Sequence, residues 1–205
     1  MKKISLIILT VMAMLSSLTA MAQFRYGPTA SVDFTNLYFK QDLIQVDQSV
    51  GASAGIAAEM EFPGLGFCLD LGLRYQQRGA TLHLGDRLMW QDQGFANERS
   101  YLHFIDIPVH LKFKYNRFDG LENIFAPFVY AGPTFSILAG HNNIPALKYS
   151  GGEVGIEFGL GAEIWRKWQI SASYDMGMTY TMKTKLLENF SAKSGTWDVR
   201  VTYLF

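Results

Sequence analysis

The chain has 205 residues, with 18 basic and 18 acidic side chains, so its formal net charge is zero. This balance argues against nucleic acid as a partner, because nucleic-acid binding normally requires a basic surface. A hydrophobic content of 49% argues against disorder. The single cysteine, Cys68, excludes an internal disulfide, and the four scattered histidines lack zinc-finger spacing. The length fits one domain, with two small domains as the alternative.

The first 22 residues have the pattern of a cleaved export signal. Two lysines precede an apolar stretch, and small residues at positions 20 and 22 form a cleavage site. Cleavage between Ala22 and Gln23 leaves residues 23–205 as the mature domain. The apolar stretch is short for a membrane span, and an uncleaved anchor helix is the alternative. We therefore expect an exported protein.

After residue 22, apolar and polar residues alternate with a period of two, which is the pattern of half-buried β-strands. The alternation predicts eight strands, at Phe24–Thr35, Val50–Phe62, Gly66–Arg78, Tyr101–Tyr115, Ala126–Leu138, Glu153–Ile164, Trp168–Thr179 and Thr196–Phe205. Such a strand content exceeds that of an ordinary globular domain and is normal for a closed barrel, which has no sheet edges.

The weakest of these strands is Ala126–Leu138, because Phe128 and Tyr130 fall on the face opposite Val129. Residues 124–140 are uncharged over about the length of a membrane helix, which is the alternative. Two prolines and a glycine within the run oppose a helix. We therefore expect a strand here.

The connections between the predicted strands alternate in length. Long, polar connections cover residues 36–49, 79–100, 139–152 and 180–195, whereas those at 63–65, 116–125 and 165–167 are shorter. Outer-membrane barrels have long extracellular loops and short periplasmic turns. The sequence therefore predicts an all-β fold, an eight-stranded antiparallel up-and-down transmembrane β-barrel with both termini in the periplasm.

The apolar face of each strand is predicted to face lipid. It carries no Asp, Glu, Lys or Arg in any of the eight strands, although it does carry His103. Charge at the bilayer midplane costs about 2–4 kcal/mol. Aromatic residues gather at strand ends, as in an interfacial girdle. The alternative is a soluble barrel with an apolar interior, but we expect outer-membrane lipid as the partner of this face.

The opposite face places charges inside the barrel. The predicted lumen network consists of Arg25, Asp33, Glu59, Glu61, Asp70, Arg74, Arg78, Asp106, Lys112, Lys114, Glu157, Glu163, Asp175, Asp198 and Arg200. An ion path or a catalytic carboxylate pair is one interpretation. Because eight strands enclose only enough space for side chains, we favour an ion-paired filling of the lumen.

Four segments resemble the PorT-like outer-membrane β-barrel family: LDLGLRYQQRGA (69–80), FIDIPVHLKFKY (104–115), PFVYAGPTFSIL (127–138) and VRVTYLF (199–205). The resemblance implies an eight-stranded barrel in the outer membrane of a diderm bacterium, and it accommodates prolines within strands. The terminal Phe205, after Tyr203, looks like the signal that the barrel-assembly machinery reads. The family's namesake is linked to protein secretion, but no residue motif here carries that role.

Candidate catalytic and metal-binding residues are few. His103 and His110 face opposite sides of one strand and so cannot bind the same metal. Ser100, His103 and Asp92 are the best set for a lipid-modifying hydrolase, but they form no recognised motif. The glycines at 151–161 do not form a dinucleotide-binding motif, and we expect them to make room for side chains inside the barrel. We expect no cofactor.

The function predicted from the sequence is that of a non-enzymatic, integral outer-membrane protein with a filled lumen and a structural, docking or surface-binding role. Its long loops carry exposed aromatic residues that could bind an envelope protein partner. The alternatives are an accessory component of a secretion or transport system and a lipid-modifying barrel enzyme.

Overall fold

The computed structural model describes residues 23–39, 46–62, 66–83, 97–115, 123–142, 147–180, 182–184 and 191–205. The predicted export signal, residues 1–22 with the cleavage position after Ala22, lies outside these residues. Gln23, the first residue of the predicted mature chain, begins the first strand.

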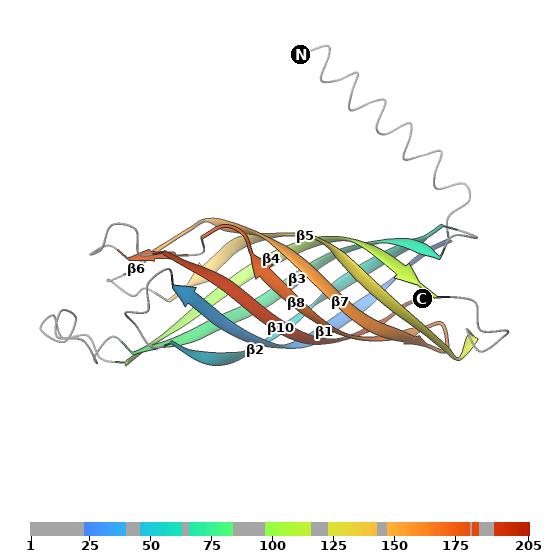
Figure 1. The fold of residues 1–205 in the computed structure, drawn as a ribbon, viewed down its shortest axis with the longest axis horizontal. Coiled ribbons are helices and arrows are strands. Elements are labelled where there is room, and N and C mark those ends of the chain that lie inside the picture. Colours follow the sequence, from blue (N-terminus) through green and yellow to red (C-terminus); the bar gives the residue numbers. More distant parts are fainter. Residues whose placement is uncertain are drawn as a thin grey trace, which may run out of the picture.

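Eight long antiparallel strands form the closed barrel shown in Figure 1. They are β1 (Gln23–Phe39), β2 (Val46–Glu61), β3 (Phe67–His83), β4 (Asn97–Lys114), β5 (Phe125–His141), β7 (Gly152–Ile164), β8 (Trp168–Gly177) and β10 (Ser191–Tyr203). Each pairs with its neighbour in this order, and β1 pairs with β10. Closure removes the sheet edges, and the predicted eight-stranded fold is confirmed.

Hydroxyl pairs line the inner side of the seam between β1 and β10. Thr29 and Thr202 face each other with their Oγ1 atoms 2.8 Å apart. Thr35 and Thr196 form the same kind of pair at 3.1 Å. Cross-strand Thr–Thr pairs stabilise antiparallel sheets, so the polar face of the terminal strands helps to close the barrel.

Two short strands correct the predicted loops at 139–152 and 180–195. The strand β6 (Leu147–Tyr149) pairs with β9 (Met182–Thr184), and β9 pairs with β10. Most of the long strands also run past their predicted outer ends, as β3 does to His83, although β8 ends at Gly177, two residues short of its prediction. Outside the bilayer no lipid selects an apolar face, so strands can continue there without the alternation on which the prediction depended.

The strand β5 replaces the alternative of a membrane helix over residues 124–140. Among the described residues, no helix is long and apolar enough to cross a membrane. Pro108 lies in β4 with Gly72 of β3 beside it, and a Cβ at Gly72 would lie 2.9 Å from the ring of the proline. The missing side chain therefore accommodates a proline inside the sheet.

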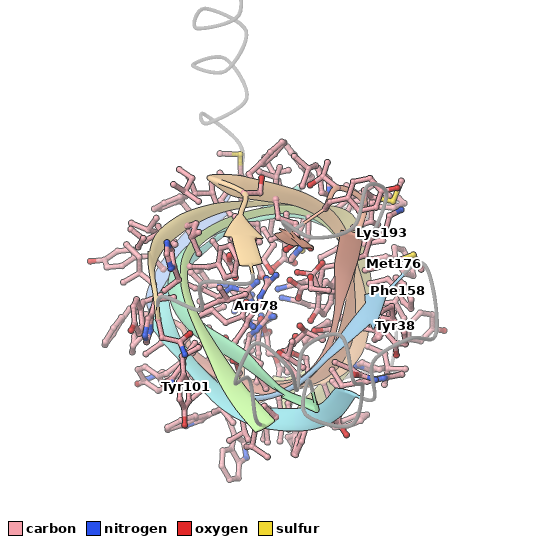
Figure 2. All side chains as sticks on the ribbon, turned by 90° about the vertical axis from the view of Figure 1, so that its left-hand side faces the viewer. Tyr38, Arg78, Tyr101, Phe158, Met176 and Lys193 are labelled. Carbon is pink, nitrogen blue, oxygen red and sulfur yellow. The ribbon has the colours of Figure 1, made fainter. Side chains whose placement is uncertain are left out.

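The outer surface of the barrel is apolar, and the end-on view in Figure 2 shows side chains projecting from it all round. Exposed aliphatic and aromatic side chains alternate with buried polar ones along the strands. At the end near the termini the exposed aromatics are Phe24, Tyr26, Phe67, Phe113, Tyr115, Phe125, Trp165, Trp168 and Phe205. Lys193 is exposed on β10 near the other end, where its Nζ lies 5.7 Å from the ring of Tyr180.

The tight turn between β7 and β8 has an unusual backbone. Trp165 and Arg166 have φ angles of 51° and 60°, in the left-handed region that such residues rarely adopt. The backbone NH of Lys167 donates to the carbonyl of Ile164. Left-handed residues suit the twist of a tight hairpin. The strand register thus outweighs the local preference of both side chains.

Candidate functional site

The lumen is the main polar site of the described structure. Successive in-facing positions of β3 carry Arg74, Gln76 and Arg78, whereas β4 brings Asp106 and Lys112 to the same interior. These side chains are buried although they are polar or charged. Buried charges require partners, and along the barrel the partners form three clusters.

The inner cluster lies nearest the termini and centres on Glu59. Its carboxylate accepts hydrogen bonds from Lys112 Nζ and Lys114 Nζ, both at 2.8 Å, and also from Arg25. Glu163 accepts from Arg25 and Lys114 at 2.8 Å each. The cations are thus shared between two carboxylates, and every charged member of this set has a partner of opposite charge.

Two further carboxylates flank the inner cluster. Asp70 lies 3.1 Å from Lys112, and Glu61 lies 3.6 Å from both Arg25 and Lys114. Glu61 is the more exposed of the two, with 22% of its side chain accessible. Their partial exposure places them at the margin of the buried interior.

The middle cluster centres on Glu157, whose side chain is fully buried. Its carboxylate accepts from Arg74 Nη2 at 2.8 Å and from Arg200 Nη2 at 2.5 Å. Ser173 Oγ at 3.0 Å and the Tyr130 hydroxyl at 3.3 Å add two neutral donors. Asp198 binds Arg200 at 3.1 Å. Two guanidinium groups and two carboxylates therefore balance in this layer.

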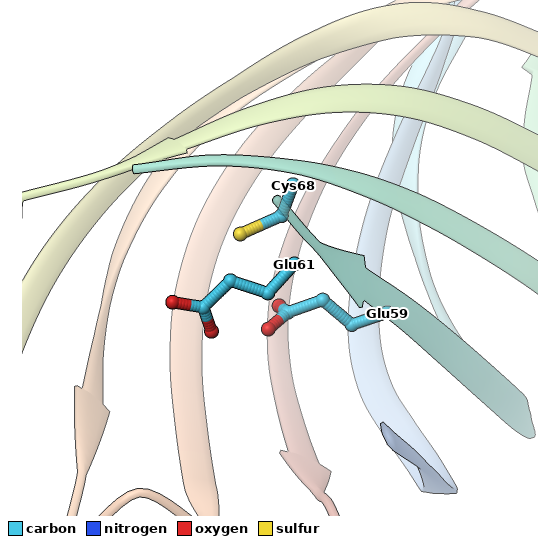
Figure 3. Close-up of side chains that lie close together, drawn as sticks. All are labelled: Glu59, Glu61 and Cys68. Carbon is cyan, nitrogen blue, oxygen red and sulfur yellow. The ribbon is translucent and has the colours of Figure 1, made fainter. Parts of the chain in front are cut away.

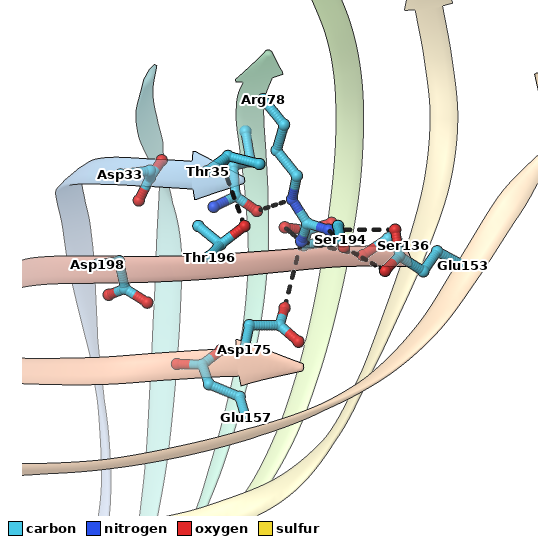
Figure 4. A network of polar contacts seen from close by, with 12 residues as sticks. Asp33, Thr35, Arg78, Ser136, Glu153, Glu157, Asp175, Ser194, Thr196 and Asp198 are labelled. Atoms are coloured by element: carbon cyan, nitrogen blue, oxygen red, sulfur yellow. Dashed lines mark hydrogen bonds and ion pairs between the residues drawn. The ribbon is translucent and has the colours of Figure 1, made fainter. Parts of the chain in front are cut away.

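The outer cluster centres on Arg78, as Figure 4 shows. Its guanidinium lies 3.1 Å from Asp106, 3.2 Å from Asp175 and 3.4 Å from Glu153. Gln76 Oε1 accepts from Arg78 Nε at 2.8 Å. One cation therefore holds three carboxylates that come from three different strands.

Aromatic side chains fill space between the inner and middle clusters. Phe128 and Tyr130 of β5 point inward and lie opposite Gly161 and Gly159 of β7 in the register. A Cβ at Gly159 would lie 2.6 Å from Tyr130 Cζ, and one at Gly161 would lie 2.7 Å from Phe128 Cζ. Gly159 and Gly161 thus make room for side chains inside the barrel, as predicted, whereas a Cβ at Gly151 would meet no atom within 4 Å, so the prediction does not hold there.

A small cavity remains between the inner and middle clusters. Its volume is about 20 Å³, and Arg74, His110, Tyr130 and Arg200 are among the residues that line it. A cavity needs roughly 10–15 Å³ to hold one water molecule. This space therefore accommodates about one water molecule and no larger solute.

The structure places the fifteen predicted lumen charges on the inner side of the strands, and most of them are buried. Ion pairs and hydrogen bonds connect most of these side chains to partners on other strands. Glu153 was missing from the predicted set, although it lies on the same face of its strand as Glu157 and bonds to Arg78 and Ser194. The period-two alternation contained this signal. Gln169, a neutral member of the inner cluster that bonds to Lys112 and Glu59, lies on the same face of β8 as Asp175, so the alternation marked it as in-facing too.

A candidate metal centre lies beside the inner cluster, where Glu59, Glu61 and Cys68 come together (Figure 3). One ligand atom from each lies within 4.8 Å of the others. However, both oxygens of Glu59 already accept hydrogen bonds from lysine ammonium groups. These cations neutralise the carboxylate and oppose a metal ion at the same place, so this cluster does not suit one.

The described histidines do not assemble a catalytic site. His103 faces outward and stacks on Tyr75, with its Nδ1 atom 2.7 Å from the Tyr75 hydroxyl. His110 faces the lumen, 3.5 Å from Glu157. The two therefore lie on opposite faces, as predicted. Asp92 and the side chain of Ser100 lie outside the part of the chain that the structure describes, so the set Ser100, His103 and Asp92 stays a prediction.

Comparison with known proteins identifies the family. Residues 16–182 match the family described as outer membrane protein beta-barrel domain. The chain belongs to this family. It is therefore a protein of the cell outer membrane, and the closed barrel with its apolar outer surface agrees with that location. The finer resemblance to PorT-like members remains a prediction.

The solved structure of an outer membrane protein supports the same fold. The outer membrane protein OprG from Pseudomonas aeruginosa is 10% identical, with a TM-score of 0.55 over 89% of this chain and 95% of OprG. Ail, the attachment invasion locus protein of Yersinia pestis, is 13% identical, with a TM-score of 0.46 over 89% of this chain and 99% of Ail. The similarity to OprG supports the fold of this chain and nothing about its function. A search of curated protein sequences found no match to this chain.

Proposed function

We propose that this protein is a non-enzymatic membrane anchor, closed to solutes, that presents its outer connections as a binding surface at the cell exterior. The observation that carries the proposal is the filled lumen. Three clusters of ion pairs and the inward aromatic rings occupy the interior. The cavity between the inner and middle clusters has a volume of about 20 Å³. A protein built in this way acts through its surfaces.

The outer end supports a binding role. There the strands continue beyond the predicted transmembrane segments, and β6, β9 and β10 form an additional antiparallel ribbon. The described turn at the opposite end, at residues 165–167, is tight. Connecting segments on a rigid scaffold are common binding surfaces. The longer outer segments therefore offer more contact area than the periplasmic turns.

The experiment that tests this role places a photo-crosslinking amino acid at one position on each side of the membrane, in intact cells. Position 90 lies in the connection between β3 and β4, and position 64 lies in the short turn between β2 and β3. We expect a discrete adduct from position 90 and none from position 64. Adducts from position 64 alone would favour a periplasmic partner, as in an accessory secretion component, and would contradict the surface role.

A further inference from the structure

Basic residues gather at the outer end of the barrel, where β10 continues into the ribbon with β9 and β6. Lys193 is exposed on β10, with its Nζ atom 5.7 Å from the centre of the Tyr180 ring. In the register, Lys183 of β9 is opposite Ser191 of β10, and Lys148 of β6 is opposite Lys183. Directly opposite residues share a face of a sheet, as do residues two apart on one strand. The three lysine positions therefore share one face and form the lysine rim.

The lysine rim is on the lipid-facing side of the barrel. Along β10, Lys193 alternates in step with Trp197 and Val199, which are exposed on the outer surface. Figure 2 views the barrel from the outer end and shows Lys193, Tyr38 and Met176 on one side of that surface. The face that carries the lysines is thus continuous with the face that contacts lipid.

The depth of Lys193 in the membrane follows from the length of β10. Lys193 and Tyr203 are ten positions apart in this strand, and the Tyr203 ring packs on Trp168 at the periplasmic end. Ten residues of strand span roughly 33 Å, and a tilt of about 35–45° reduces this to roughly 23–27 Å along the barrel axis. The apolar band of an outer-membrane barrel is about 25 Å tall. Lys193 therefore lies at the level of the outer headgroups.

Aromatic rings lie beside Lys193 and below it, toward the membrane interior. Tyr38 of β1 is opposite Lys193 in the register. A Cβ at Gly195 would lie 2.6 Å from both Tyr38 Cε2 and the Tyr174 hydroxyl oxygen, so rings from β1 and β8 meet over this glycine. The Trp197 ring follows, with its centre 4.8 Å from that of Tyr174. Tyrosine and tryptophan favour the membrane interface, so these rings suit contact with the upper part of a lipid.

Two members of the lysine rim are directly opposite each other. Lys148 and Lys183 are cross-strand partners in strands of three residues each. The Cα atoms of such partners lie about 4.5–5.5 Å apart, and like charges in this arrangement destabilise a sheet. An anion bound beside both lysines would offset the repulsion. The register thus points to a negatively charged ligand, independently of the depth of Lys193.

We propose that the lysine rim binds the phosphorylated headgroup of an outer-leaflet lipid, whose acyl chains lie against Tyr174 and Trp197. Ammonium groups bind phosphate oxygens through charge-assisted hydrogen bonds, and lysines near a membrane surface attract anionic lipids. A lipid fits better than an acidic protein, because Lys193 lies at the level of the headgroups and uncharged rings continue below it. This lipid site goes beyond the proposed surface role and does not depend on it.

The test measures lipid binding by the full-length mature chain, refolded in a neutral detergent, with native mass spectrometry. The probe is lipid A, a phosphorylated lipid with several acyl chains, and its dephosphorylated form is the control for the chains. Polyglutamate, as a mimic of an acidic protein, is tested in parallel. We expect a discrete complex with a single lipid A molecule and weaker binding of the dephosphorylated form. Sodium chloride should weaken the complex with lipid A, because salt screens exposed charges.

The variants Lys193→Gln and Lys148→Gln/Lys183→Gln each remove part of the lysine rim. Each lysine should contribute roughly fivefold to the affinity, so the double variant should bind lipid A roughly 25-fold more weakly. Lys167→Gln is the matched control, because Lys167 is exposed in the tight turn at the periplasmic end, and it should bind as the wild type does. Heat-modifiable migration verifies folding, and the two separate variants keep the test informative if one of them fails to fold.

Equal binding of lipid A and its dephosphorylated form would show that the chains alone are recognised, and it would refute the headgroup site. Unchanged affinity in both variants would do the same, as would an equal loss in Lys167→Gln, which would indicate a general effect of charge. Polyglutamate that binds the wild type and not the variants, without binding of lipid A, would assign the lysine rim to an acidic protein partner instead.

Discussion

Replacing Glu157 with glutamine tests whether the lumen is a dry, ion-paired interior. The substitution preserves the shape of the side chain and removes its charge. Glu157 is fully buried and binds Arg74 at 2.8 Å, while Arg200 lies on its other oxygen at 2.5 Å. After the change, Asp198 is the remaining carboxylate of the middle cluster for two guanidinium groups.

The size of the effect follows from burial. Removing one partner from a buried ion pair costs about 3–5 kcal/mol, because the other charge is left without compensation. The glutamine oxygen can still accept a hydrogen bond, so we expect a loss near the lower end, about 3 kcal/mol. Glu61→Gln is the control. Glu61 is 22% exposed and lies 3.6 Å from its partners, so its loss should cost less than about 1 kcal/mol.

The assay is reversible denaturant unfolding in phospholipid vesicles, followed by tryptophan fluorescence and extrapolated to zero denaturant. Trp165, Trp168 and Trp197 are exposed on the outer surface and report on loss of contact with lipid. Adding Arg74→Gln to Glu157→Gln should recover part of the loss, because the two sites are coupled. If Glu157→Gln and Glu61→Gln both stayed within about 1 kcal/mol of wild type, water would be screening the lumen charges and the filled interior would be refuted.

Three further predictions concern packing, backbone strain and assembly. Gly159→Ala places a Cβ 2.6 Å from Tyr130 Cζ and should lower the free energy of unfolding by about 1–3 kcal/mol, measured with denaturant. Gly151→Ala is the control, because a Cβ there would meet no atom within 4 Å. Equal stability of the two variants would contradict the packing of the Tyr130 ring on Gly159. Arg166→Gly relieves a φ of 60° and should raise stability by about 0.5–1 kcal/mol; a loss in the same assay would show that the side chain outweighs the strain. Phe205→Ala should slow insertion into proteoliposomes that contain the barrel-assembly machinery and leave insertion into pure lipid unchanged, since Phe205 is 68% exposed; equal slowing in both would argue against an assembly signal.

The alternation of the sequence was enough to predict the eight long strands and the side that faces lipid. It worked because each transmembrane residue faces either hydrocarbon or a crowded polar lumen. It failed beyond the bilayer, where β6 and β9 lie, because both faces of a strand meet water there. It also left β5 uncertain, since Phe128 and Tyr130 face inward, and only the register with Gly161 and Gly159 on β7 explains them.

The partners of the lumen charges could not be predicted. Parity along each strand placed Arg78 inside, but its partners Asp106, Glu153 and Asp175 are 28, 75 and 97 residues away in sequence. Which of them meet depends on the stagger of strands around the barrel, and this register is not local. The excess of carboxylates around Arg78 likewise became visible only when the charges could be assigned to layers.

The most direct test of the central claim, that the barrel is closed to solutes, is single-channel recording in a planar lipid bilayer. The purified, refolded wild-type chain is added at neutral pH, with a known porin as the positive control and detergent alone as the blank. Because the cavity between the inner and middle clusters is about 20 Å³, a filled lumen predicts no stepwise conductance above the blank. Discrete and reproducible conductance steps from the folded wild-type protein would contradict it.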